Sequence, residues 1–278
     1  MIRLAVPSQA TNSKPLAAPV QRDYLSYSAV RTFQSCPLKY KFRYVDQLPE
    51  AVVSASLVFG SALHAAVEHH LRFQLEGETA PGVPQLLQVY RDHVHAAQSQ
   101  QPIKYPRGED AAALEEQAAR MLTTYLQSEL ATPVGRILGV EEQVRGGLSP
   151  RLPEIMGYAD LIFETDEALT VRDFKTAKAK WSLEQANEQS DQLLLYGHLV
   201  RDLIPGKPIR LQFAILTKHK TPQTQVLDVQ PSMQRLQRTR RIFESVWKAI
   251  QSHNYYPVPS PLNCSGCGYR KQCAAWKG

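Results

Sequence analysis

The sequence Ile155-Met-Gly-Tyr-Ala-Asp-Leu-Ile-Phe163 is followed, after Glu164-Thr-Asp-Glu167, by Ala168-Leu-Thr-Val-Arg-Asp-Phe-Lys175. The two outer segments are rich in residues that favour strands, and the four polar residues between them are typical of a hairpin turn. Because strand residues two apart point to the same face, Asp173 and Lys175 are expected on one face and Phe174 on the other. The hairpin also brings Asp160, on the first strand, close to Asp173.

Asp160, Asp173 and Lys175 form a candidate site for phosphodiester chemistry. Two carboxylates beside one ammonium can hold a hard divalent cation and position a water molecule for attack. An Asp-x-Lys pair alone is a weak signal, because most such pairs are ordinary strand residues. Asp160 strengthens it, since this residue lies in an apolar strand where an unpaired charge is costly unless it meets a partner or a metal.

The hairpin lies within an alternation of helices and strands. Helices are predicted for a short segment that Ser28 caps and that carries Cys36, for residues 59–71, within 76–108, and over 109–130. Downstream, the sequence predicts strands over 136–144 and 209–216, a loop over 146–153, and helices over 183–203 and 232–252. This order predicts an α/β protein with a mixed central sheet flanked by helices.

Four regions follow from this pattern: a disordered leader over 1–22, an N-terminal helical region over 23–135, a core over 136–252 and a C-terminal segment over 253–278. The leader is rich in Pro, Ala, Ser and Gln and lacks the apolar run of a signal peptide. No stretch approaches the roughly 18 apolar residues of a membrane span, so no membrane partner is expected and the protein is predicted to be cytoplasmic. The net charge of +6 permits nucleic-acid binding without proving it.

Four cysteines lie near opposite ends of the sequence: Cys36 stands alone, and Cys264, Cys267 and Cys273 form a C-x2-C-x5-C pattern. Four thiolates can bind a [4Fe–4S] cluster or a closed structural zinc site. Zinc usually draws its ligands from two close pairs, whereas one cysteine here is remote. Disulfides would need an oxidising compartment, and unrelated buried thiols are the remaining alternative.

The segment Pro37-Leu-Lys-Tyr-Lys-Phe-Arg-Tyr44 alternates cations with aromatic residues directly after Cys36. Lys39, Lys41 and Arg43 could grip phosphates while the rings pack or stack. The alternative is a helix with a solvated basic face and a buried aromatic face. The pattern fits both, and the three cations are candidate DNA-binding residues.

The hairpin residues, taken with four further patterns, resemble a known family. Asp160 followed by Asp173-Phe-Lys175-Thr resembles the core motif of the PD-(D/E)XK nucleases. The other patterns resemble the RecB-like branch, which includes the AddB nuclease domain and four-cysteine CRISPR-associated exonucleases. They are the Cys-Pro at Cys36, the G-x-x-x-H of Gly60 to His64, the Q-x-x-x-Y of Gln192 to Tyr196, and the terminal cysteine trio. Together they follow the family's order over residues 24–273.

The resemblance implies a restriction-endonuclease-like core with an inserted helical region and a C-terminal iron–sulfur segment. It implies that Mg²⁺ or Mn²⁺ is bound by His64, Asp160, Asp173 and the backbone carbonyl of Phe174. Lys175 would orient or deprotonate the attacking water, and Gln192 and Tyr196, one helical turn apart, would line the site and contact substrate. A [4Fe–4S] cluster with a chiefly structural role would be bound by Cys36, Cys264, Cys267 and Cys273.

The expected function is a metal-dependent DNA nuclease, an exonuclease, that hydrolyses phosphodiester bonds in DNA repair and recombination or in CRISPR-type DNA processing. Its implied partners are DNA, as single strands or duplex ends, and a helicase or CRISPR-associated proteins. The first alternative is a non-catalytic DNA-binding iron–sulfur subunit of a repair or CRISPR adaptation complex, which the intact His64, Asp160, Asp173 and Lys175 argue against. The second is an iron–sulfur protein that acts on another substrate, which leaves the Asp-x-Lys hairpin unexplained.

Some of these residues and their neighbours also have simpler interpretations. His64 could be an ordinary helix histidine, as His69 and His70 are expected to be, and Tyr196 could be a core residue. Glu141 and Glu142 are interpreted as a solvated strand edge. Lys178 and Lys180 either contact the DNA backbone or lie in a solvated loop.

Overall fold

A computed structural model of the protein describes residues 23–278, so the predicted leader lies outside the described residues. The helices are α1 (Tyr27–Ser35), α2 (Pro37–Tyr40), the π-helix η1 (Lys41–Val45), α3 (Ala55–Leu75), α4 (Val83–Gln100), α5 (Ala111–Leu126), α6 (Leu183–Glu188), α7 (Asp191–Val200), α8 (Met233–Gln251), α9 (Pro261–Cys264) and α10 (Arg270–Ala275). The strands are β1 (Tyr24–Leu25), β2 (Val53–Ser54), β3 (Ile103–Lys104), β4 (Arg136–Gly146), β5 (Glu154–Glu164), β6 (Leu169–Ala177), β7 (Ile209–Thr217) and β8 (Thr224–Val229). None of these helices is both long enough and apolar enough to span a membrane.

The central sheet is mixed, as the sequence predicts. Its six strands run in the order β1-β5-β6-β7-β8, with β4 also paired with β5. The pairs β4–β5, β5–β6 and β7–β8 are antiparallel, whereas β1–β5 and β6–β7 are parallel. The predicted hairpin turn between β5 and β6 is confirmed, because the backbone N–H of Thr165 donates to the carbonyl of Ala168 at 2.9 Å.

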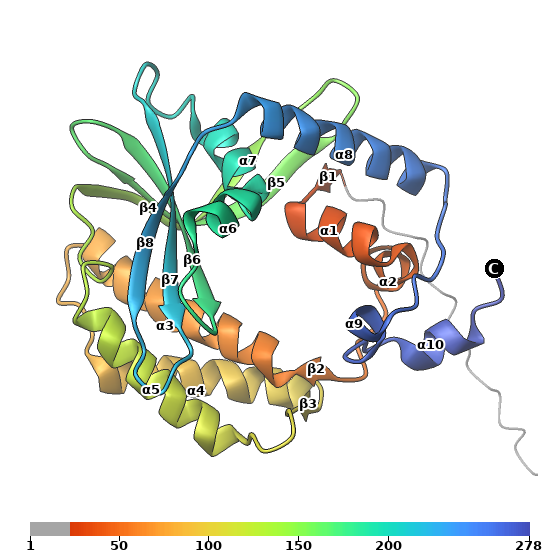
Figure 1. The fold of residues 1–278 in the computed structure, drawn as a ribbon, viewed down its shortest axis with the longest axis horizontal. Coiled ribbons are helices and arrows are strands. Elements are labelled where there is room, and N and C mark those ends of the chain that lie inside the picture. The colour runs from red at the N-terminus through yellow and green to blue at the C-terminus, as the bar shows by residue number, and fades with distance from the viewer. Residues whose placement is uncertain (1–22) are drawn as a thin grey trace, which may run out of the picture.

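Helices cover both faces of the sheet (Figure 1). The helices α3, α4 and α5 cover one face through a core that includes Leu63 and Met121. On the other face α7 packs Leu193 against Val171 of β6 and its neighbours. Beyond it, α1 and α8 form a further core around Phe243. In the view of Figure 1 the elements lie around a ring, with β6 and α3 on one side and α1 and α2 on the other.

Polar caps fix where the longer helices begin. The side chains of Ser54, Asp110 and Ser232 accept backbone N–H groups at the starts of α3, α5 and α8. The cap of α1 is Ser26, so the prediction of Ser28 was wrong by two residues. Ser26 has the extended backbone that a cap requires, whereas Ser28 already lies inside the first helical turn.

The single helix predicted over 183–203 is wrong, because the chain forms α6 and α7 with a turn between them. Ser190, at the turn, is buried, and its hydroxyl donates to the carbonyl of Asn187 at 2.6 Å. This side chain competes with the helical hydrogen bonds, which is how serine commonly interrupts a helix.

The C-terminal segment packs against α2 and the residues that follow it. Leu38, Phe42 and Tyr269 form a small core there. The side chain of Asn263 donates to the carbonyl of Ser35 at 2.8 Å, across 228 positions of sequence. The hydroxyl of Tyr269 donates to the carbonyl of Leu48 at 3.1 Å, across 221 positions. These contacts bring the two groups of cysteines to the same part of the molecule.

Candidate active site

The sheet opens where Asp160 and Asp173 lie. The β5–β6 pairing ends at Leu161 and Arg172, so these aspartates would be the next opposed residues. Instead, the backbone N–H of Phe174 donates to Oδ2 of Asp160 at 2.7 Å. A side chain therefore replaces a backbone acceptor at this point, and it holds the Asp160 carboxylate between the two strands.

Asp173 and Lys175 form an ion pair on the same face of β6. Asp173 is 3% exposed, and Nζ of Lys175 lies 2.5 Å from its Oδ2. Apart from this ion pair, the buried Oδ2 has no hydrogen-bond partner among residues 23–278. Burial opposes the charge on Lys175, but Asp173 and Asp160 outweigh it and raise the pKa of the ammonium. Lys175 is therefore a cation at neutral pH.

Helix α3 brings His64 to the same place. Its Nδ1 lies 3.6 Å from Oδ2 of Asp160, and the backbone of Phe174 also acts on its ring. Burial and the nearby Lys175 ammonium lower the pKa of His64. The ring is therefore neutral at pH 7, which is the form of histidine that binds metals.

Glu141 on β4 completes the group. One possible ligand atom from each of His64, Glu141 and Asp160 lies within 4.8 Å of the others, and within residues 23–278 no other cluster of three or more such residues meets this limit. Burial, and then the carboxylate of Glu68, raise the pKa of Glu141. The interpretation of Glu141 as a solvated strand edge is therefore wrong, because its side chain faces the site; its neighbour Glu142 is exposed.

The backbone of Glu141 is also unusual. Its φ of 49° lies in the left-handed region, inside a strand and in a residue other than glycine. Such a conformation costs about 1–3 kcal/mol and persists only where the surrounding structure imposes it, and it is enriched at functional sites.

These groups fit a hard divalent cation. The site offers three carboxylates, one imidazole and a backbone carbonyl, which is an oxygen-rich set of the kind that Mg²⁺ and Mn²⁺ prefer. Burial and the Asp173 carboxylate raise the pKa of Asp160 well above its usual range, because Lys175 alone does not balance the negative charge. A cation beside the carboxylates of Asp160 and Asp173 would supply the missing positive charge.

Helix α7 places Gln192 and Tyr196 beside the carboxylates. Nε2 of Gln192 donates to the Tyr196 hydroxyl at 3.0 Å. Burial raises the pKa of Tyr196, and the charges of Asp173 and Asp160 act on it. Because the ring is 5% exposed and packs in the core beneath the sheet, Tyr196 is both a core residue and a wall of the site.

Gly157 makes room for that tyrosine. A Cβ built at Gly157 would lie 2.5 Å from the Tyr196 ring, which is closer than any side chain can approach. This role could not be predicted, since nothing in the sequence shows that a ring from α7 crosses β5 at this position.

Glu68 is a second residue of the site that was not predicted from the sequence. It follows His64 by one helical turn, and its carboxylate acts on both His64 and Glu141. The H-x-x-x-E spacing on α3 indicates that the two side chains lie on one face of the helix.

His70, by contrast, is a structural residue, as expected. It is 4% exposed, and its Nε2 lies 3.1 Å from the carbonyl oxygen of Ala131.

Two of the three candidate DNA-binding cations are held in ion pairs. Nζ of Lys41 lies 2.6 Å from Oδ2 of Asp46, and Nη1 of Arg43 lies 3.6 Å from Oε1 of Glu50. Lys39 lines the pocket that contains the cysteines. The aromatic residues of the same run are buried. The run therefore has the buried aromatic face of the simpler interpretation.

All four cysteines line one pocket. Its other lining residues are mostly apolar and include Leu38, Phe42, Pro257, Val258 and Tyr269. None of the four cysteines forms a disulfide. Burial and the other three thiols raise the pKa of Cys273, so the sulfur atoms are near enough to influence one another. No three of these sulfurs lie within 4.8 Å of one another in the described chain. An apolar pocket that gathers four thiols fits a four-thiolate group.

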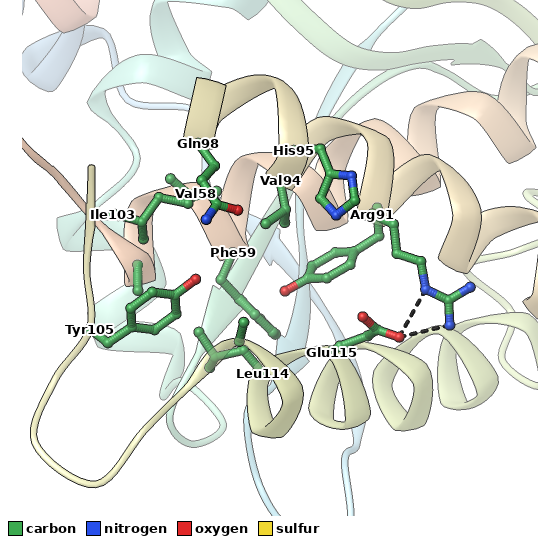
Figure 2. Close-up of a pocket in the computed structure, with 13 residues that line it drawn as sticks. Val58, Phe59, Arg91, Val94, His95, Gln98, Ile103, Tyr105, Leu114 and Glu115 are labelled. Atoms are coloured by element: carbon green, nitrogen blue, oxygen red, sulfur yellow. Dashed lines mark hydrogen bonds and ion pairs between the residues drawn. The ribbon is translucent and has the colours of Figure 1, made fainter. Parts of the chain in front are cut away.

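A separate pocket lies between α3, α4 and α5 (Figure 2). Phe59 and Leu114 contribute to its apolar wall, and an ion pair joins Arg91 to Glu115 at 2.7 Å beside it. Phe59 precedes His64 by five positions, which places the two side chains about 140° apart around α3. None of the predicted catalytic residues lines this pocket, so it is not part of the candidate site.

Comparisons with known proteins give a family and a fold. A sequence model of the PD-(D/E)XK nuclease superfamily matches residues 24–274. A crystal structure of a "Putative exonuclease" from Eubacterium rectale is 16% identical with a TM-score of 0.58, over 92% of this chain and 89% of that one. A crystal structure of SSO0001 is 12% identical with a TM-score of 0.35, over 89% of this chain and 95% of that one, and nothing further follows from it. No curated protein matches the chain.

Proposed function

Because the chain belongs to the PD-(D/E)XK nuclease superfamily, we propose that it is a metal-dependent DNA nuclease of the RecB-like branch that acts as an exonuclease. The observation that carries this proposal is the meeting of His64, Glu141, Asp160, Asp173 and Lys175 where β5 and β6 part. DNA repair, recombination or CRISPR-type DNA processing is the proposed setting. The proposed partners are single strands or duplex ends of DNA, with a helicase or CRISPR-associated proteins.

Each side chain of the site has a different proposed role. His64, Glu141, Asp160 and Asp173, with the carbonyl of Phe174, would hold Mg²⁺ or Mn²⁺. When bound, such a cation polarises the phosphate and lowers the pKa of the attacking water. Lys175 keeps its charge beside Asp173, so its ammonium can orient that water and stabilise the negative charge that develops on the phosphate. Gln192 and Tyr196 would contact the substrate strand.

We further propose that the four cysteines bind a [4Fe–4S] cluster rather than zinc. In a closed zinc site the sulfurs lie about 3.8 Å apart, because four Zn–S bonds of about 2.3 Å point to the corners of a tetrahedron. Within residues 23–278 no three of the cysteine sulfurs lie within 4.8 Å of one another, which supports the larger cluster. We propose the same regions of the chain as before: 23–135, 136–252 and 253–278. The four cysteine thiols would join the last region to the first.

The test of the function is time-resolved digestion of linear and circular DNA, each single- and double-stranded, with Mg²⁺ or Mn²⁺. An exonuclease degrades the linear molecules and leaves the circles intact, whereas cleavage of circles would replace the exonuclease by an endonuclease. Asp173→Ala and Lys175→Ala should each lower the cleavage rate by about 100-fold or more, because they remove a metal ligand and a charge that stabilises the transition state. Melting curves should show that both variants fold. Normal turnover by purified Asp173→Ala protein would refute the site.

A further inference from the structure

Helix α8 carries an unusual concentration of positive charge. Between Met233 and Gln251 it has five cations, Arg235, Arg238, Arg240, Arg241 and Lys248, and a single acid, Glu244. The carboxylate of Glu244 already has a hydrogen-bond partner, because it accepts a hydrogen bond from the hydroxyl of Ser149 at 2.5 Å. The helix therefore adds a net charge of about +4 to one side of the molecule.

Five exposed residues of α8 form a stripe of hydrogen-bond donors. Gln234, Arg238, Arg241, Ser245 and Lys248 recur at intervals of three or four positions, so they lie on one face of the helix. All five are exposed, and none is acidic, apolar or aromatic. At 1.5 Å per residue the stripe is about 21 Å long.

The cations of the stripe have no internal partner. Among residues 23–278, no side chain forms an ion pair or a hydrogen bond with the side chain of Arg238, Arg241 or Lys248. This distinguishes them from Lys41 and Arg43, whose charges are taken up by Asp46 and Glu50. The stripe therefore presents charge that an external anion can use.

One end of the stripe lies beside the candidate active site. Nη2 of Arg235, in the first turn of α8, donates to the carbonyl of Glu188 at 2.7 Å and lies 3.4 Å from Oδ1 of Asp191. Asp191 is the first residue of α7, directly before Gln192. The charges of Arg235 and Lys175 both act on the hydroxyl of Tyr27.

A groove leads along the helix from that point. Its lining residues are mostly donors, with one carboxylate: Glu188, Gln234, Arg235, Gln237, Arg238 and Arg241. Arginine, lysine, glutamine and serine are the side chains that contact phosphates in protein–DNA complexes. A membrane surface would require an exposed apolar face on α8. On this helix Phe243, Val246 and Ile250 are buried instead, and the one strongly exposed apolar side chain is Met233, at the first residue.

Building on the proposed nuclease function, we propose that the exposed stripe of α8 binds the phosphate backbone of the DNA strand and guides it to or from the catalytic site. The contact is independent of base sequence, because the stripe offers donors for phosphates and no ring for stacking. This surface replaces Lys41 and Arg43 as the main cationic contact with DNA.

The experiment measures the affinity of a fluorescent single-stranded 20-nucleotide DNA in EDTA, over a series of salt concentrations. Arg238→Gln and Arg241→Gln should each raise Kd roughly fivefold and lower the salt slope by about 0.7, the value for one lost phosphate contact on a single strand. Arg240→Gln is the matched control, because it makes the same charge change on the same helix but outside the stripe. It should bind with nearly the wild-type affinity and salt slope.

A small substrate separates this inference from the function on which it rests. Bis(p-nitrophenyl) phosphate is too short to reach α8, so the three arginine variants should hydrolyse it at the wild-type rate while Asp173→Ala does not. If the wild type degrades DNA but Arg238→Gln and Arg241→Gln bind like Arg240→Gln, the α8 inference alone is wrong. If the wild type cleaves neither DNA nor the small ester, the nuclease proposal itself has failed.

Discussion

Asp160 is the residue whose charge depends most on a cation. Burial and Asp173 raise its pKa, and its Oδ2 also accepts the N–H of Phe174. Asp160→Asn keeps an acceptor for that N–H and removes the like-charge repulsion. We expect the metal-free variant to melt about 2 °C above the metal-free wild type, which corresponds to about 1 kcal/mol for a protein of this size. Melting curves in EDTA and in Mn²⁺ measure this shift.

The same curves test the metal site. Mn²⁺ should raise the melting temperature of the wild type and leave Asp160→Asn almost unchanged, because ligands stabilise the folded state that binds them. Asp202→Asn is a control, since this carboxylate is 86% exposed and lies outside the site. A wild-type melting temperature that Mn²⁺ does not move would argue against a cation at Asp160.

Gly157 is a residue where one methyl group should matter. In Gly157→Ala the new Cβ meets the ring of Tyr196 at 2.5 Å, so the ring must move away from the carboxylates. We expect a loss of about 1–3 kcal/mol of stability, as for other overpacked sites. Nuclease activity should fall further than stability alone explains. Gly147→Ala is the matched control, because its Cβ has no neighbour within 4 Å. Equal melting temperatures for the two variants would contradict the packing of Tyr196.

Among the elements, the C-terminal segment offers the clearest spectroscopic test. Anaerobically purified protein should be brown, with broad absorbance near roughly 400 nm and about four irons per chain. Cys36→Ala should lose iron as completely as Cys267→Ala, because both thiols line the same pocket. A colourless protein with stoichiometric zinc would instead support the zinc site.

Loss of the cluster should also be visible at one backbone amide. The N–H of Ala51 donates to the carbonyl of Gly268 at 3.0 Å, next to the start of α3. In Cys36→Ala this N–H should exchange with solvent faster, since the segment that carries Gly268 loses its anchor. The amide of Phe213, in the central strand β7, is the control and should keep its protection. Unchanged protection at Ala51 would show that the thiols do not hold this contact.

Elements with a strong local pattern could be predicted from the sequence. The β5–β6 hairpin, the strand β7 and the helix α8 follow from apolar periodicity and turn residues. The edge strand β8 could not be predicted, because Thr224-Gln-Val-Leu-Asp-Val229 is half polar and forms a strand only by pairing with β7. The two-residue strands β2 and β3 likewise depend on a partner far along the chain.

The residues of the candidate site likewise divide into those that a local sequence pattern predicts and those that depend on the fold. Asp160, Asp173 and Lys175 could be placed together because one hairpin carries them all. Glu141 could not, since its position depends on a left-handed residue within β4, which no local pattern predicts. Lys41 and Arg43 show the reverse problem: the pattern identifies cations, but only the fold reveals which carboxylates neutralise them.

For the whole molecule, the contact between Asn263 and Ser35 has a consequence for the order of folding. Closing a loop of 228 residues costs about 5 kcal/mol of chain entropy, so this contact should form only after the sheet and helices between have brought its ends near. The four thiols can meet only at that late stage. If the proposed [4Fe–4S] cluster forms, a chain whose ends have not met cannot bind it, and the colour of a preparation would therefore report the fraction of molecules that have completed folding.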